Sequence, residues 1–178
     1  SMPCLSLTSE CLDEAGLAGS LANGRIDFAL GYLLAEEAAA PAGPRAARLL
    51  LEEQPVVVCV ARSSRLPDEP GPRELARLRY AFDAPGSAPC VRRWQDYCRN
   101  QGFHAEVGQV AGVEAVALQV ELGMAAAVVP AGHAIARSAG VRALPVPDAY
   151  RVASALTWNP GNLNQIVPVF AQLVEADL

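Results

Sequence analysis

The sequence predicts an α/β fold made of two lobes, and three observations carry this prediction. A helical pattern ends at Gly24 and an apolar segment, 26–32, follows almost at once, which is typical of a helix, a tight turn and a buried strand. Residues 110–130 repeat this order, with an apolar helix followed by a second apolar strand. Proline-containing segments near residues 62 and 147 have the composition of crossovers between lobes.

The first third of the chain is predicted to be mostly strand. Alternating leucines predict a strand over 4–9, and Asp13 is a suitable N-cap for a helix that ends near residue 23. Segment 35–44, rich in Ala, Pro and Gly, is predicted as a loop or a frayed turn. Apolar runs predict strands over 26–32, 48–51 and 55–60. The last of these runs is apolar on both faces, as in a buried central strand.

The rest of the chain alternates short strands with helices, the order expected of an α/β lobe. Apolar periodicity and terminal glycines predict helices over 73–78, 90–101, 113–122, 131–138 and 162–176. Strands are predicted over 79–82, 104–110, 125–129, 141–145 and 151–158. The two crossovers assign residues 1–61 plus 148–178 to lobe I and residues 62–147 to lobe II. Domains of this plan bind ligands at the strand ends.

Composition argues against several classes of function. The 178 residues are 52% hydrophobic with a net charge of −5, which is typical of a globular protein without a nucleic-acid surface. No apolar run approaches the ~20 residues that span a membrane, and the N-terminus lacks a signal peptide pattern. Five dispersed cysteines and two distant histidines predict reduced thiols, no metal and no cofactor. Motifs of hydrolases, NTPases and zinc proteases are absent, so we expect no catalytic residues. Reduced thiols are typical of the cytoplasm, where we expect the protein to be.

Four segments combine a motif with a spacing. They are Pro3 with Leu5-Ser6-Leu7; Leu21-x-x-Gly24-Arg25-Ile26-Asp27-Phe28-Ala29-Leu30; Glu53-x-Pro55-Val56-Val57-Val58 with Leu66-Pro67; and Val120-x-x-Gly123-Met124-x-x-x-Val128-Val129-Pro130. In this order and at these distances, they resemble the effector-binding (substrate-binding) domain of LysR-type transcriptional regulators. The last motif departs from the family pattern, because Met124 stands at the position of its second glycine.

The resemblance implies two Rossmann-like lobes joined by two crossovers, as in type 2 periplasmic binding proteins. It further implies a small-molecule effector bound in a cleft between the lobes, and a homodimer or homotetramer. Contact with DNA is expected only through an N-terminal winged helix-turn-helix domain, which this sequence lacks. The first strand and helix of the effector-binding domain are also expected to be missing. A solute-binding protein of the same fold is an alternative.

Candidate ligand-binding residues lie at helix starts and strand ends. They are Asp13, Glu14, Tyr32, Ser87, Gly112, Val113 and Asn159. Plainer interpretations are capping for the two acids, core packing for the tyrosine, and ordinary loop or turn structure for Ser87, Gly112 and Val113. Asn159 ends a strand beside Trp158, which is more typical of a core residue. If the two acids face the pocket, they favour a neutral, cationic or hydroxyl-rich ligand over an anion.

Two cysteines suggest a second function, thiol-based redox sensing. Peroxide-sensing members of the resembled family carry reactive cysteines in the region of Cys90 and Cys98. On one helix, eight residues apart, their Cα atoms would be about 12 Å apart. A disulfide needs less than about 7 Å, so the helix would have to unwind. Arg92 and Arg93 are expected to lower the pKa of the Cys90 thiol.

Overall fold

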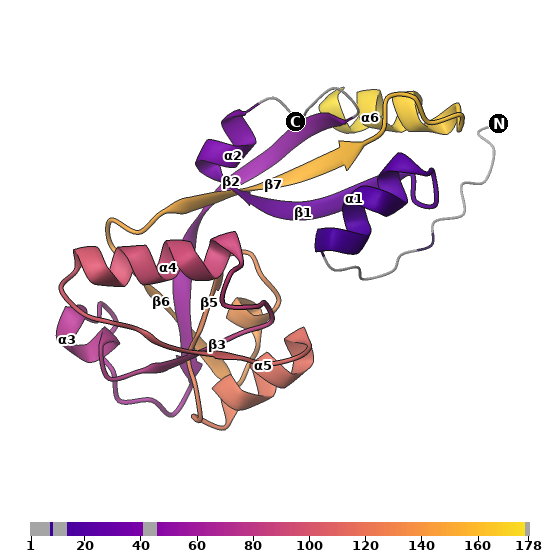
Figure 1. Cartoon of the computed structure of the whole chain (residues 1–178). Helices are drawn as coiled ribbons and strands as arrows, with labels where there is room; N and C mark the ends of the chain where they lie inside the picture. Colours follow the sequence, from indigo (N-terminus) through magenta and orange to yellow (C-terminus); the bar gives the residue numbers. More distant parts are fainter. Residues whose placement is uncertain (1–7, 9–13, 41–45, 177–178) are drawn as a thin grey trace. The chain divides into compact units, whose positions relative to one another are not determined.

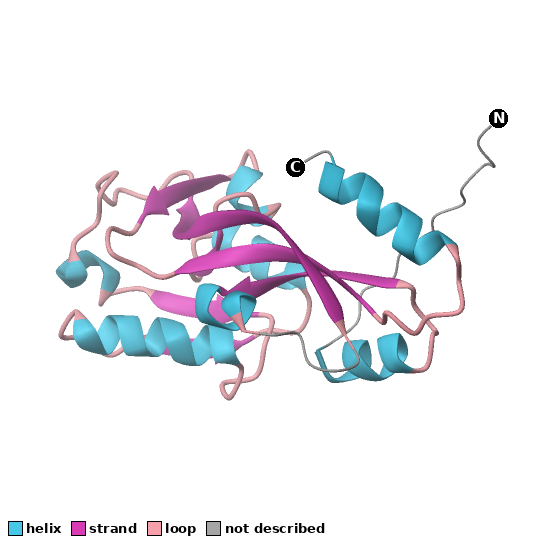
Figure 2. Ribbon diagram, turned by 90° about the horizontal axis from the view of Figure 1, so that it is seen from above, coloured by secondary structure: helices cyan, strands magenta, loops and turns pink. Residues whose placement is uncertain are grey.

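The computed structural model describes residues 8, 14–40 and 46–176, which form alternating helices and strands (Figures 1 and 2). In chain order these are α1 Glu14–Ala22, β1 Phe28–Leu34, α2 Ala35–Ala39, β2 Ala47–Ala61, α3 Pro72–Leu75, β3 Arg79–Phe82, α4 Pro89–Asn100, β4 Glu106–Gln109, α5 Val113–Glu121, β5 Ala127–Pro130, the 3₁₀ helix η1 Ile135–Arg137, β6 Val141–Pro145, β7 Arg151–Trp158 and α6 Ile166–Ala176. Two compact units contain them. Unit 1 comprises residues 1–31, 40–51 and 155–178, and unit 2 comprises 32–39 and 52–154.

The sheet of unit 2 is built around the second half of β2. β5 and β6 both pair with β2 in antiparallel orientation, with Val57 opposite Val129 in β5 and Val58 opposite Leu144 in β6. β3 and β4 pair in parallel, and a parallel bridge from Tyr80 to Ala126 places β3 beside β5. β3 and β5 therefore run in the same direction and end at the same edge of the sheet.

The alternation of side chains along β2 divides the core of unit 2 into two faces. We define the α4 face by its buried helix residues Val91, Trp94 and Cys98, which pack with Tyr80 and with the side of β2 that carries Val58. The α5 face contains the buried residues Val57, Cys59, Ala81, Val116, Val120, Ala127, Ile135 and Val141. Helices thus cover both sides of the sheet, the arrangement expected of an α/β unit.

Unit 1 is held by a small aromatic cluster and by an amide network. The ring of Phe28 lies 4.9 Å from that of Phe170 and 6.4 Å from that of Trp158, measured between centroids. The carboxylate of Asp27 accepts hydrogen bonds from the side-chain amides of Asn162 (2.9 Å) and Asn164 (3.0 Å). These contacts fix the loop that leads into α6.

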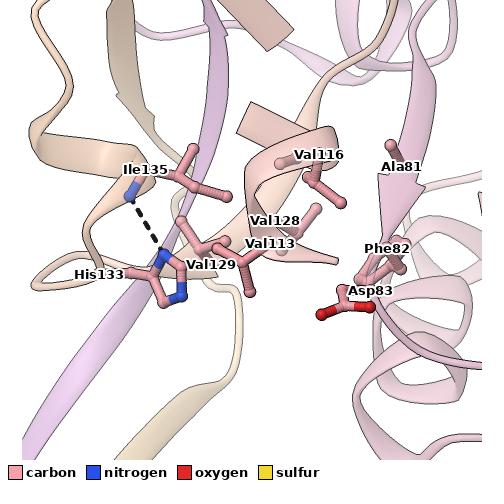
Figure 3. Close-up of a pocket in the computed structure, with 10 residues that line it drawn as sticks. Ala81, Phe82, Asp83, Val113, Val116, Val128, Val129, His133 and Ile135 are labelled. Carbon is pink, nitrogen blue, oxygen red and sulfur yellow. Dashed lines mark hydrogen bonds between the residues drawn. The ribbon is translucent and has the colours of Figure 1, made fainter. Parts of the chain in front are cut away.

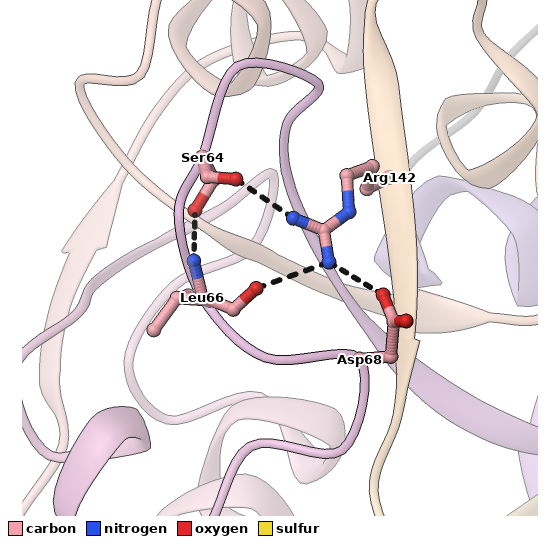
Figure 4. Close-up of polar contacts among 4 residues, drawn as sticks. All are labelled: Ser64, Leu66, Asp68 and Arg142. Atoms are coloured by element: carbon pink, nitrogen blue, oxygen red, sulfur yellow. Dashed lines mark hydrogen bonds and ion pairs between the residues drawn. The ribbon is translucent and has the colours of Figure 1, made fainter.

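Arg142 in β6 fixes the segment that follows β2 (Figure 4). Its guanidinium donates to the backbone oxygens of Ser64 (2.7 Å) and Leu66 (3.1 Å) and forms an ion pair with Asp68 (2.8 Å). A planar guanidinium with several N–H donors suits such a cluster of acceptors. The predicted crossover near residue 62 is therefore an ordered segment held by one side chain.

Most predicted elements are confirmed, with three corrections. Segment 35–44 was expected to be a loop or a frayed turn, but its first half is α2, because Ala and Glu are strong helix formers. The predicted strands 48–51 and 55–60 are one long strand, β2, whose polar middle hides its continuity. The predicted helix 131–138 is reduced to η1. The predicted strand 4–9 lies, apart from residue 8, outside the described residues.

The division into units differs from the predicted lobes. Residues 32–39, 52–61 and 148–154 were assigned to lobe I by sequence, and all of them lie in unit 2. The difference arises because the boundaries between the units fall inside the strands β1, β2 and β7. Composition does not mark a boundary inside a regular strand.

Candidate functional site

A pocket of about 80 Å³ opens on the α5 face of unit 2, where β3 and β5 end (Figure 3). It is lined by Ala81, Phe82, Asp83, Val113, Val116, Ala127, Val128, Val129, His133 and Ile135. Eight of these ten are apolar, and only Asp83 and His133 carry ionisable side chains. An apolar concavity with a few polar groups at strand ends is the usual form of a small-molecule site.

Asp83 is the first residue after β3 and is bonded to the start of α5. Its Oδ1 accepts a hydrogen bond of 2.8 Å from the backbone N–H of Gly112. Gly112 has φ of 94°, a left-handed conformation that favours glycine, and it precedes the helix directly. The N–H groups at the start of a helix attract anions. Here the carboxylate of Asp83 takes the position of such an anion.

His133 lies in the turn between β5 and η1. Its Nδ1 accepts a hydrogen bond of 3.2 Å from the backbone N–H of Ile135, drawn as a dashed line in Figure 3. Burial, and to a lesser extent the charge of Arg137, lowers the pKa of this imidazole below its ordinary value of 6.5. The ring is therefore neutral at neutral pH. With Nδ1 accepting, Nε2 carries the proton and is a donor.

The structure brings some predicted site residues to this pocket. Val113 lines it, and Gly112 donates to Asp83 at its edge. Tyr32, half-exposed at the end of β1, has its ring 6.4 Å from that of His133, between centroids. These three positions are consistent with a ligand-binding role, which stays a prediction.

The other predicted residues lie elsewhere. Ser87 is exposed in the loop before α4 and does not line the pocket. Asn159 belongs to unit 1, where its Nδ2 donates to Leu21 O (3.5 Å) and its Oδ1 accepts from the N–H of Gly161 (2.9 Å). Glu14 begins α1, and Asp13 lies outside the described residues. Their roles stay predictions as well.

Asp83 and His133 were not among the predicted site residues. The sequence around Asp83 is rich in turn-forming residues, and His133 is far from the other histidine, His104, so neither forms a recognisable motif. Both come soon after the ends of strands that were predicted correctly or nearly so. Because ligands bind at the carboxyl ends of parallel strands, the position of Asp83 and His133 just after two predicted strands is the sequence feature that could have identified them as site residues.

The two cysteines of α4 have very different surroundings. Cys98 is fully buried, and burial raises the pKa of its thiol to about 12, whereas Cys90 is exposed. Only a thiolate attacks an oxidant efficiently. Because both residues belong to one regular helix and Cys98 is kept protonated, the structure gives little support to the redox alternative.

A second, larger hollow of about 280 Å³ is lined by Gln95, Arg99, His104 and Ala105. It lies where α4 leads into β4, and Arg99 is already paired with Asp96. Of the four residues that line it, only Ala105 is apolar, and no strand ends there. The smaller pocket is therefore the stronger candidate.

The described part of the chain contains neither a metal-ion cluster nor a membrane-spanning helix. No three or more His, Cys, Asp or Glu side chains are grouped there in a way that could hold a metal ion. The same residues contain no helix whose length and apolar character would let it cross a membrane.

Comparison with solved structures shows which proteins share this fold. CbnR, a LysR family transcriptional regulator, matches with a TM-score of 0.73 and 15% identity, over 93% of this chain and 57% of that one. The BenM effector binding domain with its effector benzoate matches with a TM-score of 0.66 and 17% identity, over 93% and 75%. The probable transcriptional regulator PA0477 from Pseudomonas aeruginosa matches with a TM-score of 0.69 and 22% identity, over 89% of this chain and 53% of that one.

At these identities the structural likeness establishes the fold, and the chain spans little more than half the length of CbnR. A search of curated protein sequences found no significant match. The family model described as "LysR substrate binding domain" matches residues 1–178. The predicted resemblance and the α/β fold class are thus confirmed, and the chain belongs to the LysR substrate-binding domain family.

Proposed function

We propose that this chain is the ligand-sensing domain of a LysR-type transcriptional regulator, and that the pocket on the α5 face of unit 2 contributes to its effector site. The observation that carries the proposal is the position of the pocket. It lies where β3 and β5 end and α5 begins, and it combines apolar walls with Asp83 and His133. Ligands of α/β domains bind at such strand ends.

The family and one relative support the same function. The chain belongs to a substrate-binding domain family, and the related BenM domain was solved with its effector benzoate. By analogy, an effector alters the balance between two conformations and so changes the activity of the DNA-binding domain. In this proposal the domain has no catalytic role, acts in the cytoplasm and functions in a homodimer or homotetramer. A site between two lobes remains a prediction.

A thermal-shift screen against a metabolite library, in reducing buffer, tests the proposal. A ligand present at about 100 times its Kd stabilises the folded state by roughly 2.7 kcal/mol. For a domain of this size the midpoint should rise by about 5–10 °C. Small, mostly apolar compounds are expected among the hits.

Two tryptophan variants on α5 separate binding in the pocket from binding elsewhere. Val113 lines the pocket and is 39% exposed, so Val113→Trp should fill the pocket without disturbing the core. Leu118 is on the same helix, is 56% exposed and does not line the pocket, so Leu118→Trp is the matched control. Hits should be lost in the first variant and kept in the second. Hits unaffected by both would place the effector site elsewhere.

A further inference from the structure

Charge is unevenly distributed at the mouth of the α5-face pocket. Asp83 is the only side chain of the lining that is charged at neutral pH, because the pKa of His133 is lowered. Glu114, in the first turn of α5, carries a neighbouring carboxylate but lies outside the lining. Its Oε2 lies 3.7 Å from the position that a Cβ on Gly112 would occupy. No arginine or lysine lines the pocket.

This arrangement removes the usual reason for a carboxylate ligand to bind at a helix start. The backbone N–H of Gly112, at the beginning of α5, already donates to Asp83. A ligand carboxylate arriving at this end would compete with Asp83 for that donor and would be repelled by its charge. The guanidinium of Arg137, which lies close enough to lower the pKa of His133, donates to the backbone oxygen of Gly132 and does not line the pocket.

The carboxylate of Asp83 suits a ligand that carries N–H donors. Asp83 is exposed, and a carboxylate accepts about four hydrogen bonds, so one bond to Gly112 leaves most of its acceptor capacity free. His133 offers its Nε2–H as a donor on the opposite side of the valine side chains (Figure 3). The walls between them, formed by Val113, Val128 and Val129, require an apolar body.

On the basis of the proposed function, we propose that this pocket selects a short, branched aliphatic ligand ending in an uncharged or cationic N–H group, and rejects carboxylates. Asp83 accepts from the ligand's N–H group, and the valines pack against its hydrocarbon part. The volume of about 80 Å³ limits the buried part to a few heavy atoms. In this respect the chain differs from the related BenM domain, whose effector is the carboxylate benzoate.

Three probes of the same shape test the selectivity: isobutyramidine, isobutyramide and isobutyrate, which are cationic, neutral and anionic at neutral pH. Each is titrated into the ¹⁵N-labelled 178-residue chain, and binding is read from the amide signals of Gly112, Val113 and His133. We expect the amide and the amidine to bind at least about tenfold more tightly than isobutyrate. Affinities of such small compounds are expected in the millimolar range.

Two charge-neutralising variants complete the test. Asp83→Asn keeps an oxygen that accepts from Gly112, so the fold is retained, and it should abolish the preference of the wild type. Glu114→Gln removes an equal charge from the same helix end but lies outside the lining, so the preference should persist.

The possible outcomes separate this inference from the proposed function. Equal affinity for the three probes, or tightest binding of isobutyrate, would overturn the selectivity while leaving the pocket as a ligand site. A preference that survives in Asp83→Asn would show that another group selects the ligand. If no probe shifts the pocket signals at saturating millimolar concentrations, both the selectivity and the proposed site are wrong.

Discussion

The two faces of the unit 2 sheet use the same strand, β2, but are filled in opposite ways. On the α4 face large aromatic side chains close the core: Trp94 and Tyr80 are fully buried, with ring centroids 5.1 Å apart. On the α5 face the buried residues are aliphatic side chains and one cysteine, and the strand ends enclose a pocket of about 80 Å³. Large side chains fill the space between helix and sheet, whereas small ones leave part of it open.

The comparison indicates that the two faces have different roles. A tightly packed face stabilises the unit, and a loosely filled face can admit a ligand without a large loss of core contacts. The α5 face also places an acid and an imidazole, Asp83 and His133, at the pocket. Measurements of stability, reactivity and pH dependence can therefore compare the two faces directly.

The largest effect is expected from truncation on the α4 face. Trp94 is 0% exposed, and its ring also stacks on Tyr97 with centroids 5.2 Å apart, so Trp94→Ala should reduce the free energy of unfolding by about 3–5 kcal/mol. On the α5 face, Val113→Ala at the 39% exposed pocket wall should cost less than about 1 kcal/mol. Urea unfolding measures both values. Equal losses would contradict the division between the faces.

A smaller effect is expected from the arginine that holds the segment after β2 (Figure 4). Arg142→Ala leaves the backbone oxygens of Ser64 and Leu66 without their donor and should cost about 1–3 kcal/mol. Asp68→Ala should cost less than about 1 kcal/mol, because the Asp68 side chain is 97% exposed and its ion pair is weakened by water. If Asp68→Ala were as destabilising as Arg142→Ala, the ion pair rather than the carbonyl contacts would hold the segment. Neither variant removes atoms from the pocket lining, so Arg142 tests stability independently of it.

Sequence patterns predicted the elements of unit 2 better than its site. β3 and β6 agree with the predicted ranges because each is a short, mostly apolar run bounded by polar or turn residues. The pocket depends instead on which loops meet after folding. Asp83 and His133 are fifty residues apart in the chain, and only the parallel pairing of β3 beside β5 brings their loops to one edge. Local periodicity does not encode that pairing.

The third prediction uses one buried cysteine on each face to report how easily that face opens. Cys98 on the α4 face and Cys59 on the α5 face are both fully buried, and burial raises the pKa of each thiol to about 12. In a Cys4→Ser, Cys11→Ser background, a maleimide should label the exposed Cys90 quickly and the two buried thiols slowly. Because local opening is easier where packing is looser, Cys59 should react before Cys98.

Mass spectrometry of the labelled peptides, at increasing times, measures this order. Peroxide treatment of the same protein should not link Cys90 to Cys98, because the regular helix keeps them about 12 Å apart. Earlier labelling of Cys98 would contradict the looser packing of the α5 face. A disulfide between the α4 cysteines would instead revive redox sensing as the function.

The smallest expected effect is a dependence of stability on pH that comes from the α5 face alone. The pKa of His133 lies below its ordinary value of 6.5 in the folded chain, mainly because of burial. As the pH falls through 6.5, the unfolded chain therefore takes up a proton first, and the free energy of unfolding decreases until the folded-state pKa is passed. On the α4 face, burial raises the pKa of Tyr80, which stays uncharged throughout this range.

Urea unfolding from about pH 8 to about pH 5 should show a steeper decline in the free energy of unfolding for the wild type than for His133→Asn. Asn keeps an oxygen that can accept from the N–H of Ile135, and His104→Asn, which changes the histidine outside the pocket, serves as the control. Identical pH profiles for the wild type and His133→Asn would mean that the imidazole is equally easy to protonate in the folded and unfolded chain. The pocket would then be more open to water than the packing of its valines implies.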